Sequence, residues 1–546
     1  LVDPEPMREQ PGTQGSVHAF GASNGLRAGL AARVDTMPAK VEGLSLRLSA
    51  NATSSADRSA PDYILGNTAS RELNIGMAVG YAGENLHARI SWDRYDLSNG
   101  ICYCAGHATP ASLLASAGGT PVGASNWERG RGIDQPRQQV THDRVIGRFG
   151  LDVGAAGHID GTVAFQHNHR VEEDAVRDSF EGEQLDFTLR TTTADIAYSH
   201  PPVALGLDNT VEGSIGVAGL FQENVFRGVP LVPNHRTGSV GVYAWERLWR
   251  RHAAIEVGGR VDRTFRSAFL TDTAKERLDR RGIEADCEPT ASASRCDAGW
   301  TAAVATIGGM WGTADDRFDV KLDLSSGARA PSIDEQFLNG SAPTFPVLGL
   351  GDPRLGIETA YTVGLTSHVH LDWVHGEVAP YASRIDDYIQ FVPVVNDDGS
   401  PVIDVLARGA FPRYAFVATD ATFVGVDAQF TVAPDKLVAV SHYSHDPSAG
   451  SMPVDTARRW PATGGSVEDI LAAEADMVVA SSFLPPATRA ALDQLGIPVV
   501  VLGMSNSVEE NLAQVRELSA AVGEAEAGEA LVLTNLRGIR AHIVVG

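Results

Sequence analysis

The chain has few cationic side chains for its length and no long apolar run. It carries 44 Lys and Arg against 68 Asp and Glu, a formal net charge of -24. Binding to nucleic-acid phosphates needs clustered Lys and Arg, so this balance excludes a nucleic-acid partner. A membrane-spanning helix needs about 20 consecutive apolar residues, and the sequence has no such run. Any membrane embedding must therefore use β-strands.

Leader and enzyme motifs are also missing. The first residues, LVDPEPMREQ, contain neither an initiator Met nor a basic-then-apolar leader, so no export signal is expected within this sequence. The sequence has no Ser-His-acid order, Walker loop, dinucleotide fingerprint or HExxH, and the Gly464-Gly465 pair is too short for a phosphate cradle. We therefore predict that the protein is not an enzyme and has no resident cofactor.

Only four cysteines are present, in two close pairs. Cys287 and Cys296 bracket CEPTASASRC, and such a pair in an exported loop predicts a small disulfide. Cys102 and Cys104 are separated by one residue, a spacing unfavourable for a disulfide. With His107 they form CxCxxH, which indicates a soft-metal site; a loop with two unpaired or strained thiols is the alternative.

Alternating apolar residues dominate the first four hundred positions. In Arg71 to Leu97 one alternating run is followed by the turn AGEN and then by a second run, which predicts a hairpin with one apolar face. The same alternation occurs in GLSLRLSA, QLDFTLR and VKLDL. Short connections such as AGEN alternate with long polar ones such as Thr271 to Asp297, as in outer-membrane barrels. A soluble β-sandwich is the alternative, although it needs a second apolar face.

Three motifs in the second half add a more specific signal. GARAPSIDEQFLNG (Gly327 to Gly340), GDPRLGIETAYTVGLT (Gly351 to Thr366) and EVAPYASRIDDYIQF (Glu377 to Phe391) follow one another in order. Together they resemble the late barrel of TonB-dependent outer-membrane receptors, and the resemblance extends over residues 15–432. It implies a barrel of about 22 strands in outer-membrane lipid. It also implies import of a scarce metal-chelate ligand, driven by a TonB-type energy-coupling complex through a plug that we expect outside these residues.

The pattern changes after Phe430. The strand-like segments LVAVS, MVVA and IPVVVL alternate with helical segments, which predicts a parallel sheet with ligand-binding loops at the strand C-termini. LVAVSHYS, PATGGSVEDILAAEADMVVASSFLPP and LGIPVVVLG resemble the periplasmic substrate-binding proteins of ABC importers that carry cobalamin, siderophores and other metal chelates. This resemblance implies an ABC permease as a further partner. It also implies ligand-facing loops at Ser441, His442, Tyr443, Ser444, Thr463, Gly464, Gly465, Ser481, Ser482 and Phe483.

Paired histidines are a weaker signal. His167 and His169 fall on one strand face, as do His368 and His370. Alternate-residue histidines can bind zinc or copper, and the alternative is a role at a turn or at the membrane interface.

These observations predict a mainly β chain: a partial antiparallel transmembrane β-barrel followed by a small α/β parallel-sheet lobe. The expected domains are residues 1–432, a receptor barrel without its plug and last strands, and residues 433–546, a partial N-terminal lobe of a binding protein. We expect the barrel in the cell outer membrane and the lobe in the periplasm. The predicted function is energised uptake of a siderophore, cobalamin, haem or zinc complex. The alternatives are a periplasmic substrate-binding component and a nonfunctional gene fusion.

Overall fold

The computed structural model describes residues 11–532, with gaps at 108, 118, 175–182, 207, 229–230, 284, 372–373, 407–408, 433–435, 447–453, 483, 504–507, 527 and 530–531. Its main feature is a 20-stranded sheet in which long neighbouring strands are antiparallel. The long strands are β1 (Gly12–Ala22), β2 (Arg27–Met37), β3 (Leu44–Ser55), β6 (Ser70–Ala82), β7 (Leu86–Gly100), β8 (Arg137–Asp152), β9 (His158–Glu173), β10 (Glu183–Ala204), β11 (Asn209–Gly228), β12 (Asn234–Arg250), β13 (Ala253–Leu270), β15 (Ser294–Gly312), β16 (Phe318–Arg329), β19 (Glu358–His370), β20 (Val374–Pro393) and β22 (Gly409–Val432).

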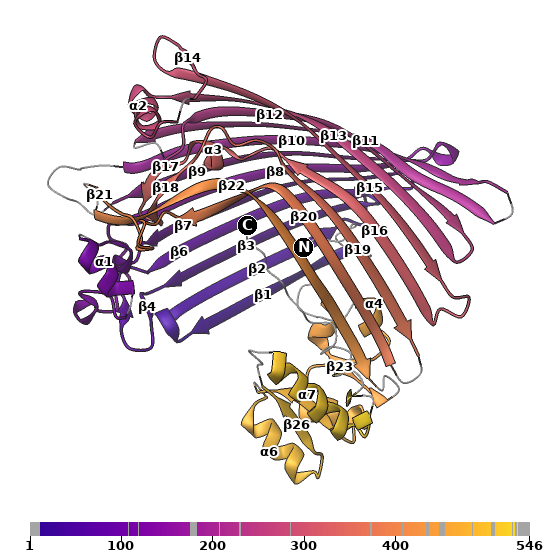
Figure 1. Cartoon of the computed structure of the whole chain (residues 1–546). Coiled ribbons are helices and arrows are strands. Elements are labelled where there is room, and N and C mark those ends of the chain that lie inside the picture. Colours follow the sequence, from indigo (N-terminus) through magenta and orange to yellow (C-terminus); the bar gives the residue numbers. More distant parts are fainter. Residues whose placement is uncertain are drawn as a thin grey trace.

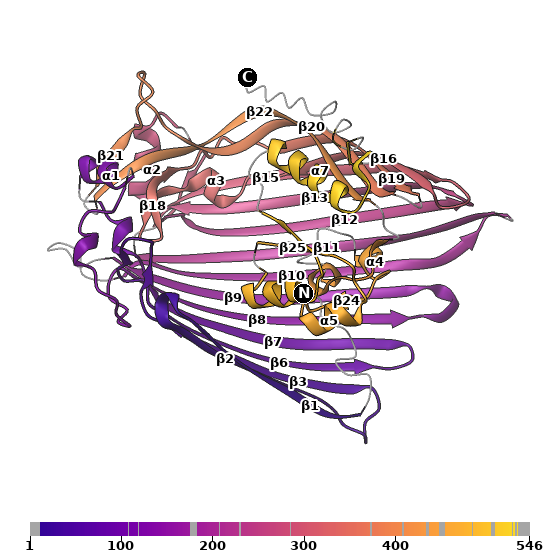
Figure 2. The same cartoon turned by 90° about the horizontal axis from the view of Figure 1, so that it is seen from below.

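The sheet curves into an open half-barrel (Figures 1 and 2). Within the described residues, β1 pairs along its length with β2 alone. At the other edge, β22 pairs along most of its length with β20. The two strands are therefore the free edges of the half-barrel.

Short turns and long connections lie at opposite ends of the sheet. Residues 83–85 and 251–252 form tight turns at one end, while residues 101–136 and 330–357 form long connections at the other. The long connections contain the smaller elements β4 (Arg58–Ser59), β5 (Ile64–Leu65), β14 (Glu288–Pro289), β17 (Asn339–Ala342), β18 (Phe345–Leu350), β21 (Ile403–Leu406), η2 (Tyr103–Ala105), α1 (Pro110–Ala117), η3 (Ala124–Asn126), α2 (Asp272–Arg280) and α3 (Ile333–Phe337). The short one-turn elements η1 (Asn24–Leu26) and η4 (Gly154–Ala156) join β1 to β2 and β8 to β9. The loop end of the sheet thus holds most of the irregular structure.

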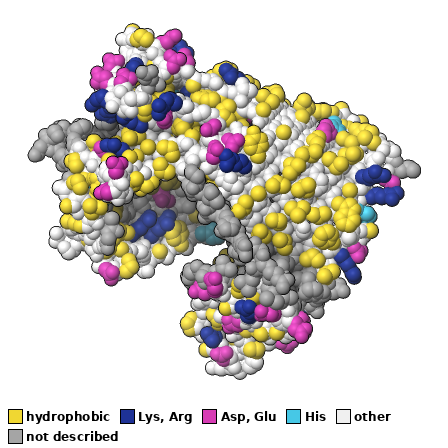
Figure 3. Space-filling model, viewed as in Figure 1, with side chains coloured by type: hydrophobic (Ala, Val, Ile, Leu, Met, Phe, Trp, Pro, Cys, Tyr) yellow, Lys and Arg dark blue, Asp and Glu magenta, His cyan; other side chains and the backbone are white. Residues whose placement is uncertain are grey.

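The strands have two chemically different faces. On β6, the outer face carries Leu73, Ile75, Met77, Val79 and Tyr81, each at least 37% exposed. Because successive side chains in a strand alternate between faces, the residues between them point inward, and these are polar or small. Figure 3 shows the apolar rows on the outer surface and basic side chains within the hollow.

One of the predicted apolar runs faces the other way. Leu185, Phe187 and Leu189 pair across β10 and β11 with Gly228, Phe226 and Asn224, and Leu185 is buried. Phe187 stacks on Phe226 with the ring centroids 5.9 Å apart. This run lies near the loop end of β10, where the connections cover the inner surface of the sheet. Alternation in the sequence therefore marks a two-faced strand without showing which face is lined by lipid or solvent.

A small α/β segment follows β22 at the short-turn end (Figure 1). Its strands form two parallel pairs, β23 (Val440–Ser441) with β24 (Ala462–Thr463) and β25 (Val478–Ser481) with β26 (Val499–Leu502). Its helices are η6 (His442–His445), α4 (Val454–Ala457), α5 (Val467–Ala472), α6 (Pro486–Gln494) and α7 (Val508–Ala521). Of the helices in the described residues, none is long and apolar enough to cross a membrane. The predicted fold class, mainly β with an appended parallel α/β lobe, is confirmed.

Candidate functional site

The long connection between β16 and β19, residues 330–357, crosses the loop end of the half-barrel, and we call it the strap. Ser332 caps α3 by accepting a hydrogen bond from the Glu335 amide (3.2 Å), and the Glu335 carboxylate accepts one from the Ser332 amide (2.6 Å). Arg329, the last residue of β16, donates two hydrogen bonds of 2.9 Å to Glu335 and two, of 3.0 and 3.1 Å, to Glu358. The capping box and this arginine fix the direction in which the strap leaves the sheet.

Burial at α3 changes the ionisation of its two acidic residues. Burial raises the pKa of Asp334, and the neighbouring Glu335 carboxylate adds to this effect. For Glu335, burial favours the neutral acid, but the hydrogen bonds from Arg329 and Ser332 outweigh it and hold its pKa below the usual value. Arg329 and Glu335 are therefore a charged pair at neutral pH.

The strap is attached to β13 through a buried arginine. Arg266 donates hydrogen bonds of 2.7 Å to the Pro331 carbonyl and to Gln336 Oε1. Gln336 is fully buried and donates in turn to the Pro353 carbonyl at 3.2 Å. Arg266 thus connects the sheet with the start of the strap directly and with its end through Gln336.

The strap also reaches the opposite wall of the half-barrel. Thr344, in the turn between β17 and β18, donates a 2.6 Å hydrogen bond from its hydroxyl to Glu172 at the end of β9. Glu172 is completely buried, and it also accepts hydrogen bonds from Gln138 and Arg170. The following strand, β18, pairs in parallel with β22. The strap therefore spans the mouth of the half-barrel from β16 to β9 and β22.

A second set of connections lies at the loop end of the sheet near β3 and β6. Asp57 accepts hydrogen bonds from the amides of Thr68 (2.6 Å), Ala69 (3.0 Å) and Gly130 (2.9 Å). Asn67, which has a positive φ of 60°, donates to the carbonyls of Ile101, Asp134 and Pro136. These two buried side chains hold residues 56–69 and 101–136 together.

The structure joins Cys102 and Cys104 by a disulfide across η2, where their Cα atoms are 5.0 Å apart. This differs from the predicted soft-metal site, because the tight turn brings the two sulfurs together and leaves neither as a thiolate ligand. Burial lowers the pKa of His107, and its carbonyl accepts a 2.7 Å hydrogen bond from the Ala410 amide. Among the residues that the structure describes, no group of three or more potential metal ligands is found.

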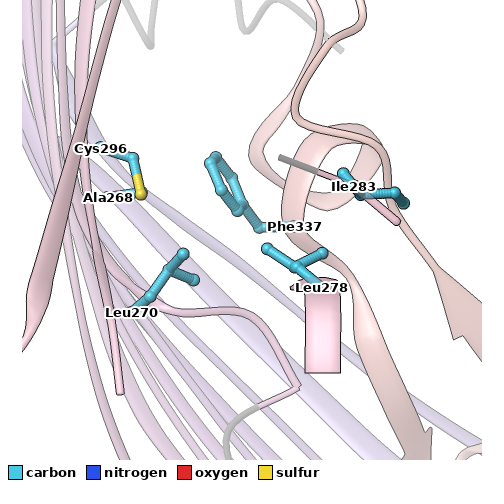
Figure 4. Packing of buried hydrophobic residues seen from close by; sticks show 6 residues of the cluster. All are labelled: Ala268, Leu270, Leu278, Ile283, Cys296 and Phe337. Atoms are coloured by element: carbon cyan, nitrogen blue, oxygen red, sulfur yellow. The ribbon is translucent and has the colours of Figure 1, made fainter. Parts of the chain in front are cut away.

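Cys287, in the connection between β13 and β15, is joined by a disulfide to Cys296 near the start of β15. Cys296 lies in a buried apolar cluster with Ala268, Leu270, Leu278, Ile283 and Phe337 (Figure 4). Phe337 comes from α3 of the strap, whereas Leu278 comes from α2 and Leu270 from β13. The cluster therefore packs the strap against the disulfide-containing connection.

Two of the predicted ligand-facing loops of the α/β segment lie together. Ser441 pairs with Thr463 between β23 and β24, and His442 Nδ1 is 3.3 Å from the Thr463 carbonyl oxygen. Tyr443, like Ser444 in η6, follows directly on this strand, and its side chain is 60% exposed.

The glycine loop of the segment is held by the start of α5. Gly464 donates its amide to Asp469 (3.0 Å), and Gly465 donates to the Thr463 hydroxyl (3.1 Å). Ser481 ends β25 in the other parallel pair and Ser482 follows it, while Phe483 lies outside the described residues. Strand pairing thus brings the first two loops together, whereas within the described residues the third belongs to a separate pair of strands.

The histidine pairs lie apart from these sites. His169 Nε2 is 2.9 Å from Asp186 Oδ1 on the outer side of β9 and β10. His368 Nδ1 is 2.7 Å from Asp319 Oδ1, near the short turn between β19 and β20. Each pair therefore has an acidic neighbour at a strand end.

Comparison with known proteins finds similar proteins for both parts of the chain. The periplasmic binding protein family matches residues 417–535. The match begins inside β22, which pairs with β20 as far as Val432, so its first residues belong structurally to the large sheet. No curated protein sequence matches the chain.

Solved receptor structures share the fold of the large sheet. The Serratia marcescens hemophore receptor HasR, solved with its hemophore and heme, is 12% identical with a TM-score of 0.54; the alignment covers 77% of this chain and 60% of that one. The copper transporter OprC gives 12% identity, a TM-score of 0.54 and coverages of 78% and 60%. The Escherichia coli K12 ferric-catecholate import receptor Fiu gives 12%, 0.52, 78% and 63%. This chain thus spans about three fifths of the length of these receptors.

The large sheet therefore has the fold of a TonB-dependent outer-membrane receptor barrel, as its sequence motifs predicted. The chain combines a sheet of this fold with a segment that resembles a periplasmic binding protein.

Proposed function

We propose that this chain is an outer-membrane receptor for the energised uptake of a metal chelate. The observation that supports this most directly is the two-faced sheet, with exposed apolar rows outside, polar residues inside and the long connections gathered at one end. Lipid on the outer face would remove the apolar rows from water, which is energetically favourable. A siderophore, cobalamin, haem or zinc complex is the proposed cargo, and no catalytic step is proposed.

We assign residues 1–432 to the receptor barrel and residues 433–546 to the partial binding-protein lobe. In support of this division, antiparallel pairing continues to Val432 and the first parallel pair begins at Val440. Because β22 ends beside the start of β20, at the same end of the sheet as the tight turns, the lobe would lie on the periplasmic side of an outer-membrane barrel. A TonB-type energy-coupling complex is the proposed periplasmic partner of the barrel.

A periplasmic substrate-binding component of an ABC importer is the second candidate function. It is favoured by the parallel β23–β24 pair, which places His442 and Tyr443 beside Thr463 at the strand C-termini, where ligands bind in such sheets. In this role the predicted loops from Ser441 to Ser444, from Thr463 to Gly465 and from Ser481 to Phe483 would contact a chelate, and an ABC permease would receive it.

The experiment that tests the first proposal is fractionation of source membranes with mass spectrometry. The tryptic peptide Tyr414 to Lys436 runs from β22 into the lobe. We expect it in the outer-membrane fraction, in a band whose gel migration changes on heating. Recovery from the soluble periplasm would favour the binding component instead. Peptides of the two parts at separate molecular sizes, without the junction peptide, would contradict both proposals for this chain.

A further inference from the structure

An apolar cavity lies among the connections at the loop end of the sheet, and we call it the loop cavity. Its volume is about 390 Å³, and its walls come from the β11–β12 connection, the end of β13, α2 and the strap. The apolar residues that line it are Phe226, Leu231, Val232, Pro233, Phe269, Leu270, Ala274, Leu278 and Phe337. Cavities of roughly 300–1,000 Å³ with a mostly apolar lining are typical of small-molecule sites.

The buried side of the loop cavity belongs to the apolar cluster described above. Leu270, Leu278 and Phe337 line the cavity, and each is at most 7% exposed (Figure 4). The Asn339 amide donates a 2.9 Å hydrogen bond to the Leu231 carbonyl, which attaches the strap to the β11–β12 connection. A packed cluster and a backbone hydrogen bond therefore hold the walls in place.

One face of α2 contributes the wall that carries charge. Thr273 and Ala274 line the cavity, and so do Arg277 and Leu278 four residues later, a spacing that places all of them on one side of the helix. The Thr271 hydroxyl caps this helix by accepting a 3.2 Å hydrogen bond from the Ala274 amide.

Arg277 is the single charged residue that lines the loop cavity, and it is exposed. Within the described residues its guanidinium has no ion pair or hydrogen bond. The other basic residues of α2 differ, because Lys275 pairs with Asp279 and Arg280 donates to the Glu276 carbonyl. A free guanidinium beside an apolar cavity matches a ligand with one carboxylate and an apolar body, since guanidinium donors bind carboxylate oxygens in bidentate geometry.

The remaining polar groups of the cavity offer little to a polar ligand body. Asn234 Oδ1 already accepts a 2.5 Å hydrogen bond from the Phe226 amide, and the Thr271 hydroxyl is used by the helix cap. An apolar cavity of about 150 Å³ holds one benzene, so the loop cavity has room for a body more than twice that size.

We propose that the loop cavity binds a medium-chain fatty acid, with its carboxylate on Arg277 and its alkyl chain against Leu270, Leu278 and Phe337. The inference adds a second ligand to the proposed receptor function and does not depend on it, because the walls of this cavity lie entirely within the loop end of the sheet.

The test is photoaffinity labelling of the full chain in detergent. The probe is decanoate with a diazirine in the middle of its chain, and the corresponding decanol is the neutral comparison. Mass spectrometry of the labelled peptides separates the site from probe dissolved in micelles. We expect adducts on residues 231–234, 269–278 or 337–339 that excess unlabelled decanoate prevents. At equal free concentration octanoate should compete about fifteenfold less well, since each buried methylene changes affinity about fourfold.

Two variants and a matched control assign the contacts. Arg277→Gln should lower decanoate labelling at least about fivefold and leave decanol labelling unchanged, because it removes a charge-assisted hydrogen bond. Thr273→Phe places a ring in the cavity from an exposed position and should lower labelling by both probes. Arg280→Gln removes a charge from the same helix outside the cavity and should label like the parent. Heat-dependent gel migration like that of the parent shows that each variant is folded.

Three results would overturn the inference. Adducts confined to the outer face of the sheet would place the fatty acid outside the loop cavity. Equal labelling of the parent by decanoate and decanol would remove the role of Arg277. Equal decanoate labelling of the parent, Arg277→Gln and Thr273→Phe would remove the site itself. Each of these results leaves the receptor proposal in place, because membrane fractionation tests that proposal separately.

Discussion

Glu172 accepts hydrogen bonds from both the hydroxyl and the amide of Thr344, although 172 residues separate them in the chain. This contact attaches the turn between β17 and β18 to the end of β9 and places the strap across the mouth of the half-barrel.

Replacing Glu172 with Ala should release this turn. The change removes the buried carboxylate that Gln138, Arg170 and Thr344 share. Because Arg170 is 31% exposed and keeps its hydrogen bond to Thr344, we expect local destabilisation of about 1–3 kcal/mol, the usual cost of leaving buried hydrogen-bonding groups without a partner. Hydrogen exchange of residues 339–350 should accelerate. Glu246→Ala is the matched control, since Glu246 is 49% exposed and contacts His200. Unchanged exchange of the strap in Glu172→Ala would contradict this anchoring role.

Two substitutions at Asn67 separate the loss of its hydrogen bonds from the strain of its positive φ. Asn67→Gly removes the hydrogen bonds to Ile101, Asp134 and Pro136 but tolerates the positive φ, whereas Asn67→Ala loses the bonds and also strains the backbone. We expect both variants to expose residues 101–136 to proteolysis, with Ala less stable than Gly by about 1 kcal/mol. Equal stability of the two would argue against a backbone contribution.

The ionisation of Glu335 should make the strap sensitive to acid. Because its folded pKa lies below the ordinary value of 4.5, the stabilisation is fully present above that value. It is lost as the pH falls through the folded pKa and Glu335 becomes protonated. The exchange rate of the amides of residues 332–338, divided by the intrinsic rate at each pH, should therefore rise as the pH is lowered from 7.

Glu335→Gln is the matched control for this pH dependence. The amide can keep the capping hydrogen bond to Ser332 but cannot ionise beside Arg329. The exchange rate relative to the intrinsic rate should be higher in this variant at pH 7 and nearly independent of pH. An acid response as large as that of the parent chain would assign the effect to another group.

A charge on the outer face should impair membrane insertion. Val242 is 58% exposed and lies between Val217 and Val261 on neighbouring strands. If this face meets lipid, Val242→Arg should destabilise the inserted chain by about 2–4 kcal/mol.

Ser239→Arg, on the inner face of the same strand, is the control for Val242→Arg and should be tolerated. The measurement is the fraction of chain recovered in the outer membrane. Equal recovery of the two variants would contradict lipid contact on the outer face.

Local sequence patterns determined much of this protein. Alternation is a property of single strands, and the AGEN turn fixes the pairing of β6 with β7, so the hairpin of residues 71–97 was predicted and is observed. The motifs between Gly327 and Phe391 similarly indicated the receptor barrel that the solved structures match in fold. The close spacing of Cys287 and Cys296 also suggested the disulfide present in the structure.

The tertiary structure alone decided the contacts that build the mouth and the inner wall. Arg89 and Arg148 are joined by a long connection, residues 101–136, and no short turn sets the register that places them face to face. The spacing of residues within each strand does not specify which residues pair across β7 and β8. Likewise, curvature of the whole sheet brings Thr344 to Glu172. The alternation of residues in the sequence specifies which side chains each strand places on its two faces. The pairing and curvature of many strands together determine which of those side chains come into contact.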